Sequence, residues 1–412
     1  MNISNKIIKN INRVKFYIVS ILAFLVPFLI YLLTLERKLI GGDTTWYALQ
    51  IPEMYVMVPT GYPTFSLLGK LFTFLPVGDL AFRLNLFSAV FGGLTILFLF
   101  LAVNRLVKNE FIGLASSLIF AFLNSFWHVA NRLEFDTLNS FFIVLVLYTA
   151  VLYTQVKKSK FLYLFFFSLG LSLTNHPIAL FVVPAVLLYV LISDPKIFKS
   201  IKKILLSILF FILPLFSYSY LIIRSRQGYG EVTDLKRLLY YMTGRDISGQ
   251  IHGGHFFDKP LSEILNLVWD YIIIIYDSFG PVLIIIAIIG LGYLIKKNWK
   301  LGLCSILFII FNIIVPPLYL PFANDNYVID SMIVVSVFIS FGFLLILNLS
   351  ILAFDRSVKG HKLLRTDIVI KYFLIVSILI TFLLFPIFQA SLSYGNMDRS
   401  KPSDIYSFWD QT

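Results

Sequence analysis

An aspartate that directly follows two glycines is the first residue in the chain whose surroundings suggest chemistry. Gly41-Gly42-Asp43 comes soon after the first long apolar run. The two glycines let the backbone turn sharply and leave open space around the carboxylate. Such a carboxylate can act as a general base for an attacking hydroxyl, an effect worth ~10²–10⁴ in rate. The alternative is an N-cap for a helix that begins at Thr44, because aspartate is a favoured N-cap residue.

A second polar cluster separates two later apolar runs. Residues 128–136 read His-Val-Ala-Asn-Arg-Leu-Glu-Phe-Asp and contain Arg132 and Glu134. Ionisable groups next to apolar spans are costly to place, so they are candidates for a functional site. An ordinary solvated loop is the alternative interpretation.

Three further positions carry side chains that could bind a ligand. Arg83 begins an apolar run, where its fork of donors suits a phosphate or where it simply snorkels to the interface. His176 precedes Pro177 in a tight turn, although a lone histidine is more often structural. Tyr62 lies in Pro59-Thr60-Gly61-Tyr62-Pro63, which predicts a rigid turn.

Other signatures of chemistry are weak or missing from the sequence. His252 and His255 have a spacing that suits metal binding on a helix, but Gly253-Gly254 between them makes a helix unfavourable there. The sequence contains no Ser/His/Asp set, P-loop or dinucleotide fingerprint. A site without a metal ligand set is therefore expected.

The elements that must position these residues are transmembrane helices. Of 412 residues, 58% are hydrophobic and only 14% are charged, whereas a soluble domain carries roughly 25% charged residues. Runs of about 20 apolar residues, each enough to cross the bilayer, recur along the chain. The sequence predicts an all-α polytopic bundle of about eleven spans, at 14–35, 81–104, 111–127, 137–155, 161–176, 177–193, 204–222, 279–295, 301–320, 328–349 and 368–390.

The charges give these spans an orientation. Of the 34 basic residues, 21 fall in the N-terminal segment and in the short loops on one side, which hold only four of the 22 acids. The positive-inside rule makes that side cytoplasmic. We therefore expect a multi-pass cell-membrane protein with its N-terminus inside and its C-terminus outside. The net charge of +12 then reflects topology and not a nucleic-acid partner.

The outer side has the longer segments, where function is expected. We expect a single transmembrane domain with outer segments at 36–80, 223–278 and 391–412. Short helices are predicted within these segments at about 44–57, 63–74, 234–242 and 261–276, and aromatic residues in them suit the membrane interface. The run 271–295 is broken by Asp277 and Gly280-Pro281, so we interpret it as an interfacial helix leading into the eighth span.

The order of these motifs resembles a known family. The sequence reads Gly41-Gly42-Asp43, Gly61-Tyr62-Pro63, Phe-Arg-Leu-Asn-Leu-Phe-Ser-Ala-Val-Phe over 82–91, Leu173-Thr174-Asn175-His176 and Tyr241-Met242-Thr243-Gly244-Arg245. It is similar to the GT-C superfamily of multi-pass membrane glycosyltransferases. Within that superfamily it most resembles the protein O-mannosyltransferase-related family.

The resemblance implies an activity. Such enzymes move a sugar, here most simply a mannose-like hexose, from a polyprenyl-phosphate carrier to an acceptor hydroxyl on the outer face. The acceptor class (protein, lipid or glycan) stays open. Inversion at the anomeric carbon is expected. No metal is required in principle, because a phosphate paired with arginine is already a fair leaving group.

The resemblance also assigns roles to residues. Asp43 corresponds to the presumed catalytic base, and Arg83 to the residue that binds the carrier phosphate. Glu134 matches an acidic position in the second outer loop, and His176 a histidine that contacts phosphate or sugar. The remaining positions expected to contact the substrate or the lipid phosphate are Arg132, Tyr62, Arg224 and Arg245.

Two other functional classes are also consistent with many membrane spans and a basic chain. A polyprenyl-lipid flippase or transporter usually keeps polar sites near the midplane, on broken helices in repeated halves. Here the span interiors are apolar and the sequence has no internal repeat. A non-catalytic membrane scaffold would leave the polar residues gathered at one interface unexplained.

Overall fold

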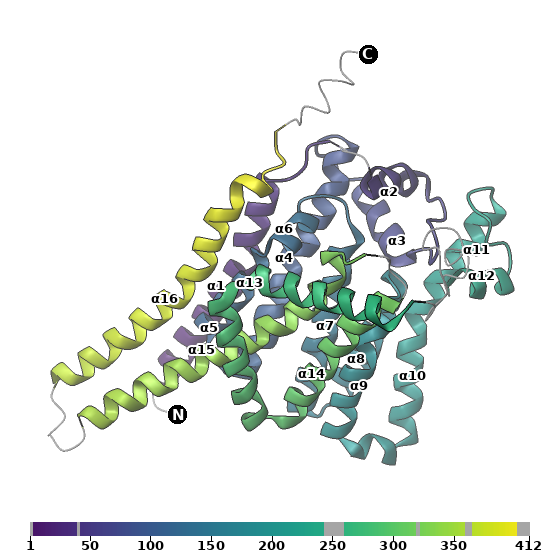
Figure 1. Ribbon diagram of the computed structural model, residues 1–412. Helices are drawn as coiled ribbons and strands as arrows, with labels where there is room; N and C mark the ends of the chain where they lie inside the picture. Colours follow the sequence, from purple (N-terminus) through teal and green to yellow (C-terminus); the bar gives the residue numbers. More distant parts are fainter. Residues whose placement is uncertain (1–2, 39–41, 243–258, 319–321, 359–364, 402–412) are drawn as a thin grey trace.

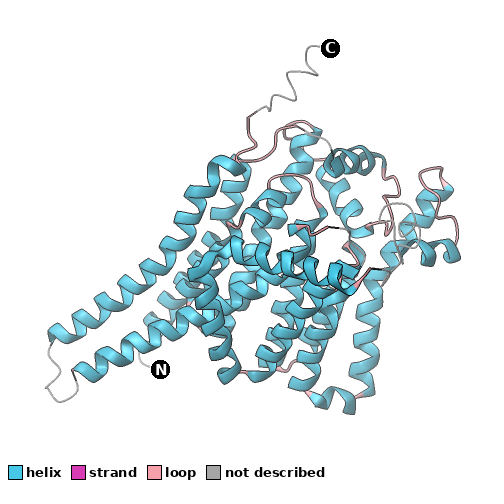
Figure 2. Cartoon of the chain, in the orientation of Figure 1, coloured by secondary structure: helices cyan, strands magenta, loops and turns pink. Residues whose placement is uncertain are grey.

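The computed structural model describes residues 3–38, 42–242, 259–318, 322–358 and 365–401, and across these ranges it is helical without a strand (Figure 2). Apolar runs of span length supply the long helices, and the segments between them supply shorter ones. The helices are α1 (Ile3–Leu33), α2 (Gly42–Glu53), α3 (Pro63–Phe72), α4 (Leu80–Val107), α5 (Glu110–Ala121), α6 (Asn124–Ala130), α7 (Phe135–Val156), α8 (Ser159–Asn175), α9 (Ala179–Ser193), α10 (Ile201–Leu215), α11 (Ser219–Arg226), α12 (Leu235–Met242), α13 (Leu261–Lys297), α14 (Trp299–Ile314), α15 (Ile329–Ser357) and α16 (Arg365–Met397). Short 3-10 helices are η1 (Pro195–Lys199), η2 (Phe216–Tyr218), η3 (Pro316–Leu318) and η4 (Asp325–Val328).

Each predicted span overlaps one or more helices, which confirms the all-α membrane bundle. The span predicted at 111–127 is divided between α5 and α6, and the one at 204–222 covers α10, η2 and the start of α11. In the described residues, eight helices are long and apolar enough to cross a membrane, and a ninth span results if α5 and α6, bent by 74°, count together. The helix α9 is apolar but shorter, and α8 has 17 residues. The number of about eleven crossings stays a prediction.

The bundle has a buried centre and a lipid-facing periphery. In α7 and in the span that contains α15, 72% of the most apolar window is buried inside the protein, whereas for α16 the share is 6%. Figure 1 shows α16 along the outside of the bundle. Its exposed apolar side chains, such as Phe373 and Phe388, are suited to contact lipid.

Glycines let the central helices approach closely. A Cβ atom at Gly290 of α13 would lie 1.9 Å from the carbonyl oxygen of Phe338 in α15. A Cβ atom at Gly342 of α15 would lie 2.3 Å from the carbonyl oxygen of Ile286 in α13. Small residues at such crossings are typical of helix pairs in membranes.

The helix α13 is bent where the sequence predicts a break. Gly280 has φ 71° and ψ 167°, which is not helical and which favours glycine. Pro281 follows and suits the first turn of the second arm. Figure 1 shows the two arms of α13 running in different directions, the second toward the start of α14.

Two contacts concern the loops at one end of the bundle. There Lys15 pairs with Glu110 at 2.8 Å, and the Lys300 ammonium donates to the carbonyl of Ile192 at 2.8 Å. All four residues belong to the side that the charge pattern assigns to the cytoplasm. The grouping agrees with the predicted topology, whereas the side that faces the cytoplasm stays a prediction.

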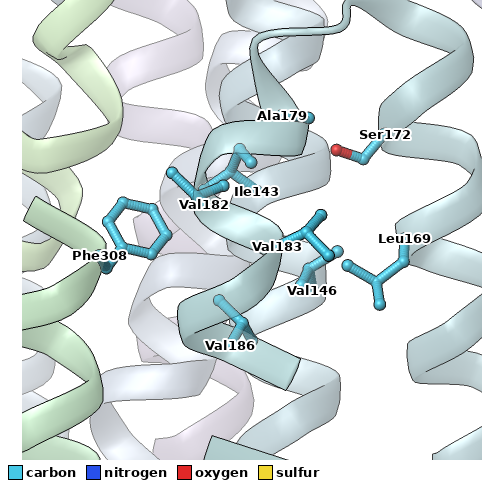
Figure 3. A pocket seen from close by; sticks show the side chains of 9 residues that line it. All are labelled: Ile143, Val146, Leu169, Ser172, Ala179, Val182, Val183, Val186 and Phe308. Carbon is cyan, nitrogen blue, oxygen red and sulfur yellow. The ribbon is translucent and has the colours of Figure 1, made fainter. Parts of the chain in front are cut away.

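The middle of the bundle holds a small apolar pocket between α7, α8, α9 and α14 (Figure 3). Its lining is apolar apart from Ser172 and includes Ile143, Val182 and Phe308. The space has no room for a water-sized sphere. We interpret it as a gap in a dry core.

Candidate active site

Asp43 is carried by α2, a short helix after the first span. It is exposed and is the second residue of α2, so it is not the N-cap of a helix beginning at Thr44. A carboxylate in the first turn is stabilised by the helix dipole. Thr44, the next residue, is buried and its hydroxyl lies 3.5 Å from Oε1 of Glu134. Thr44 thus connects Asp43, its neighbour in the chain, to Glu134, although the two acids come from separate loops.

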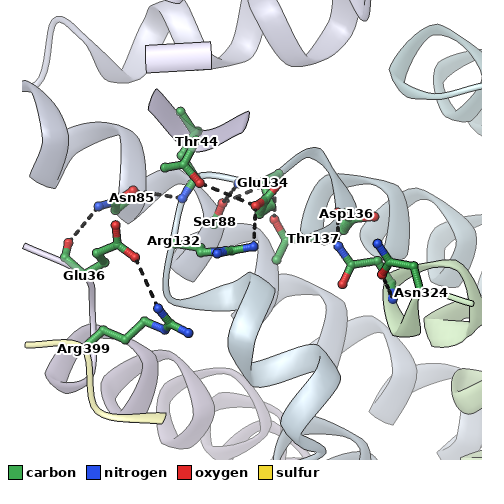
Figure 4. Close-up of polar contacts among 12 residues, drawn as sticks. Glu36, Thr44, Asn85, Ser88, Arg132, Glu134, Asp136, Thr137, Asn324 and Arg399 are labelled. Atoms are coloured by element: carbon green, nitrogen blue, oxygen red, sulfur yellow. Dashed lines mark hydrogen bonds and ion pairs between the residues drawn. The ribbon is translucent and has the colours of Figure 1, made fainter. Parts of the chain in front are cut away.

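Glu134 is buried, and Arg132 pairs with it. A guanidinium Nη2 of Arg132 lies 2.8 Å from Oε1 of Glu134, whose side chain is 6% exposed. The backbone N–H of Glu134 donates to the Ser88 hydroxyl at 3.1 Å. Figure 4 shows Glu134 between Thr44 on one side and Arg132 on the other. Of the predicted site residues, this acid and this arginine are directly paired.

One face of α4 fixes the loop that carries this ion pair. The Asn85 side chain accepts from the N–H of Leu133 at 2.8 Å and donates to the carbonyl of Glu36 at 2.7 Å. Ser88 lies one turn later and contacts Glu134. Residues three apart share a helix face, so these two polar residues hold the loop as a unit. Neither residue was predicted as a site residue, although both are polar residues in a mostly apolar run.

The environment of Glu134 opposes its charge. Burial is the main cause that raises its pKa to about 7, and the negative Asp43 and Glu36 add to the effect. Arg132 and the Thr44 hydroxyl act in the opposite direction. Near neutral pH this carboxyl therefore exchanges a proton, and its charge decides how firmly it holds Arg132.

Two buried aspartates extend the polar site into the bundle. Asp136 accepts a hydrogen bond from the Asn326 amide at 3.1 Å. Asp330 accepts from the Asn139 amide at 3.2 and 3.3 Å. Asp136 belongs to the polar cluster at 128–136, but the sequence analysis did not choose it as a site residue. Asp330 could have been recognised from the sequence, because it is an acid at the start of an apolar span.

An aromatic stack lies beside the acids. The His176 ring stacks on Phe135 at 4.4 Å and faces Tyr62 at 5.3 Å. Nδ1 of His176 accepts the N–H of Ile178 at 3.2 Å, so in the neutral ring the proton lies on Nε2 and can be donated. Tyr62 is buried, and Asp43 and Asp136 are near enough to raise its pKa, although burial is the larger cause. The structure therefore brings Tyr62 and His176 together with the acids.

Arg83 holds the loop between α3 and α4. Its guanidinium donates to the carbonyls of Thr73 and Leu75 just after α3, and its Nε donates to the carbonyl of Asp79. Positions 83 and 85 point away from each other on a helix, so Arg83 does not share the face that holds Glu134. Phosphate binding by Arg83 stays a prediction.

Arg224 holds the end of α2. Its Nε donates to the carbonyl of Met54 at 3.1 Å, and another guanidinium nitrogen donates to that of Glu53. The guanidinium also lies 3.8 Å from the ring centre of Tyr229. A cation at a helix C-terminus stabilises the exposed carbonyls. Ligand contact by Arg224 stays a prediction, and Arg245 lies outside the described residues.

Arg399, just after α16, also contacts the site, and no pattern in the sequence predicted this contact. Nη1 of Arg399 lies 3.9 Å from Oε2 of Glu36, which is buried. The Asn131 amide donates to the carbonyl of Met397 at 2.7 Å. The end of α16 and the segment after it are therefore tied to the segments that hold Glu36 and Asn131, as Figure 4 shows for Arg399 and Glu36.

Metal ligands do not gather in the part of the chain that the structure describes. No group of three or more His, Cys, Asp or Glu side chains there could hold an ion. The pair His252 and His255 lies outside the described residues.

The fold is that of GT-C membrane enzymes. ArnT from Cupriavidus metallidurans bound to undecaprenyl phosphate superposes with a TM-score of 0.53 at 10% identity, covering 93% of this chain and 72% of ArnT. The apo state of ArnT gives 0.58 at 10% identity, covering 94% and 77%. The archaeal oligosaccharyltransferase AglB from Archaeoglobus fulgidus, in complex with an inhibitory peptide and a dolichol-phosphate, gives 0.52 at 12% identity, covering 93% and 56%.

Sequence comparisons confirm the resemblance to the protein O-mannosyltransferase-related family. Residues 43–198 match the family model of the protein O-mannosyl-transferase TMEM260 N-terminal domain. The protein O-mannosyl-transferase tmem260 of Dictyostelium discoideum is 25% identical over 309 residues, 68% of this chain and 37% of that protein. The TMEM260 protein of Mus musculus is 31% identical over 223 residues, 51% and 31%. The chain thus spans about a third of the length of these relatives.

Proposed function

We propose that the chain is a glycosyltransferase that moves a mannose-like hexose from a polyprenyl-phosphate carrier to an acceptor hydroxyl at the outer membrane face. One observation carries the proposal. An exposed carboxylate, Asp43, stands beside a buried acid–arginine pair, Glu134 and Arg132, at one end of a GT-C bundle. The matched family segment, 43–198, contains all three residues, and the names of the relatives give the reaction class.

The residues suit a single displacement. Asp43 accepts the proton of the acceptor hydroxyl while its oxygen attacks the anomeric carbon. The bond from that carbon to the phosphate oxygen breaks, and the carrier leaves as polyprenyl phosphate. Attack from the side opposite the phosphate inverts the anomeric centre. A positive group near the leaving oxygen lowers the barrier because negative charge develops there.

Arg132 is the best placed of the predicted arginines for that task. Arg83 and Arg224 direct their guanidinium groups to backbone carbonyls. Arg132 instead stands beside the acids, and its Nε–H is buried with no hydrogen-bond partner among the described residues. Leaving such a donor unpaired costs about 1–3 kcal/mol, so a phosphate oxygen that accepts from it would be bound favourably.

The proposal includes the arrangement in the membrane. The whole of 1–412 acts as one transmembrane domain, with outer segments 36–80, 223–278 and 391–412 and a cytoplasmic N-terminus. The carrier's tail stays in lipid while its phosphate reaches headgroup depth. The acceptor hydroxyl belongs to a protein, a lipid or a glycan.

Reconstitution tests the proposal against its rival. The purified chain in proteoliposomes is supplied with radiolabelled polyprenyl-phosphate-mannose and with an extract of membrane and secreted acceptors. We expect label to move from the carrier to an acceptor and the released carrier to be unglycosylated. Movement of the intact labelled carrier across the bilayer without sugar transfer would instead establish a flippase.

A further inference from the structure

A second polar cavity lies between α6, α13, η4 and α16, next to the site. It has a volume of about 530 Å³. The residues that carry the argument line it from all four elements: Asn124, Asp277, Asp325, Gln389, Ser393 and Asn396. Ligand pockets for small molecules have volumes of about 300–1,000 Å³, so the space is large enough for a hexose.

One buried polar atom of this cavity has no partner within the described part of the protein. Oε1 of Gln389 is buried and accepts no hydrogen bond within the described ranges. Asn124 and Asn396 also line the cavity, and both are exposed. A buried acceptor without a partner costs about 1–3 kcal/mol. The buried oxygen of Gln389 is therefore an acceptor that a ligand hydroxyl would satisfy, with the exposed amides of Asn124 and Asn396 beside it.

The chemistry of the lining selects a neutral, hydroxyl-rich ligand. Asp277 and Asp325 contribute negative charge, and no basic side chain is among the lining residues that the structure describes. A phosphate would be repelled. Amides and hydroxyls both donate and accept, as sugar hydroxyl groups require, and Ile274 and Leu392 offer apolar surface to the C–H groups of a sugar ring.

Two short links join the cavity to the acids. Asp325 is followed by Asn326, whose amide donates to Asp136. Asn124 begins α6, and His128 one turn later is within electrostatic reach of Arg132, Arg399 and Asp325. His128 is thus near both the cationic groups and Asp325 of the cavity.

We infer that the cavity between α6, α13, η4 and α16 binds the ring of a neutral saccharide. The inference rests on the proposed function, because it assigns a subsite to a sugar that the enzyme handles. The sugar comes either from the glycosylated carrier or from a glycan acceptor. Both sources present the same hydroxyl groups to Gln389 and Asn396.

A matched pair of serines on α16 provides the test. Ser393 is buried and lines the cavity, whereas Ser391 is exposed and points to another face of the same helix. Ser393→Leu fills the cavity, and Ser391→Leu makes the same change outside it. Gln389→Leu removes the unpaired acceptor at nearly constant volume. Thermal unfolding of each purified full-length variant checks folding.

Binding of methyl α-mannopyranoside to the full chain in detergent is followed by saturation-transfer NMR. We expect the affinity to fall at least tenfold in Ser393→Leu and Gln389→Leu and to stay unchanged in Ser391→Leu. Two further probes are polyprenyl-phosphate-mannose and bare polyprenyl phosphate. If the sugar belongs to the donor, both cavity variants weaken only the mannosylated carrier. If it belongs to a glycan acceptor, both carriers bind as before and only the free hexose is lost.

Equal binding of all probes to the wild type and to both cavity variants overturns the inference, and so does a cavity that binds Mg²⁺ or Ca²⁺ but no hexose. These failures are separable from failure of the proposed function. Sugar transfer with an unchanged KM in Ser393→Leu refutes the cavity and keeps the enzyme. Hexose binding that depends on Gln389, in a protein that transfers no sugar, keeps the cavity and refutes the enzyme.

Discussion

Burial gives the two carboxylates of the site different tasks. Asp43 is exposed at the start of α2, where it can reach an incoming hydroxyl and exchange its proton with water. Glu134 is buried, and its nearest charged partner is Arg132. A group held in this way orients a neighbour better than it transfers protons. We therefore assign proton transfer to Asp43 and positioning of Arg132 to Glu134.

Asp43→Asn tests the first assignment. We expect sugar transfer to fall by about 10²–10⁴, because the amide cannot accept the proton of the hydroxyl. Folding should be nearly unchanged, because loss of a first-turn charge costs about 0.3–1 kcal/mol. Transfer from polyprenyl-phosphate-mannose is the measurement, and Asp270→Asn, an exposed aspartate on α13, is the matched control. Full activity of Asp43→Asn would remove Asp43 from the mechanism.

The raised pKa of Glu134 predicts a pH dependence of the rate. The carboxyl is charged above its pKa of about 7 and neutral below it. Lowering the pH through this value therefore weakens its hold on Arg132, and the wild-type rate should fall. Glu134→Gln is uncharged at every pH, so its rate should be lower than that of the wild type but should not fall further as the pH is lowered through about 7. The ratio of wild-type to variant rates between about pH 5 and 9 is the measurement. A ratio that does not change with pH would contradict the positioning role.

Breaking the ion pair should also affect stability. Arg132→Met leaves the buried Glu134 without its cation, which costs about 1–3 kcal/mol. Adding Glu134→Gln should restore part of the loss, because no unpaired charge then stays buried. Thermal unfolding of the single and double variants in one detergent gives the comparison. A double variant less stable than either single variant would show that the pair does not act as described.

At the scale of elements, the sequence predicted the helices better than their connections. Apolar runs identify the spans, and Pro63 marks the start of α3 because proline suits the first helical turn. The contacts of Arg83 and Arg224 could not be predicted in this way. Each binds carbonyl groups on another element, and Arg224 reaches residues about 170 positions away in the chain. No local pattern encodes such a contact, so the sequence could not predict which carbonyl groups these arginines bind, and their predicted ligand contacts stay predictions.

Close helix packing gives a prediction for α13. In Gly290→Ala the new methyl group meets the carbonyl oxygen of Phe338 at 1.9 Å, so α13 and α15 must separate. Overpacking of this kind costs about 1–3 kcal/mol. Gly292, two residues later, has nothing within 4 Å of its Cβ position, so Gly292→Ala should be neutral or stabilising by about 0.5–1 kcal/mol. Thermal unfolding of the two variants separates the cases, and equal stability would refute the close contact.

At the scale of the molecule, the site is an assembly of distant loops. Glu36 follows the first span, Glu134 follows α6, and Arg399 follows the last helix, yet the three lie in one connected set of polar contacts. The charge pattern predicted that these segments share a side, because each is reached after the appropriate number of crossings. It could not predict that Asn85 would join them, since that bond depends on how α4 packs.

The sidedness of this assembly can be tested chemically. The one cysteine, Cys304, is buried, so a Cys304→Ser chain provides a background for single cysteines. Thr233 lies on the predicted outer side and Lys158 on the inner side, and both are exposed. In intact cells a membrane-impermeant maleimide should label Thr233→Cys at once and Lys158→Cys only after permeabilisation. The reverse pattern would place Asp43 in the cytoplasm. The proposed reaction would then have to use an acceptor on the inner face. Asp43 and Thr233 lie on the same side because Arg224 of α11 donates to Met54, just after the helix of Asp43, and Arg226 of α11 donates to the carbonyl of Thr233.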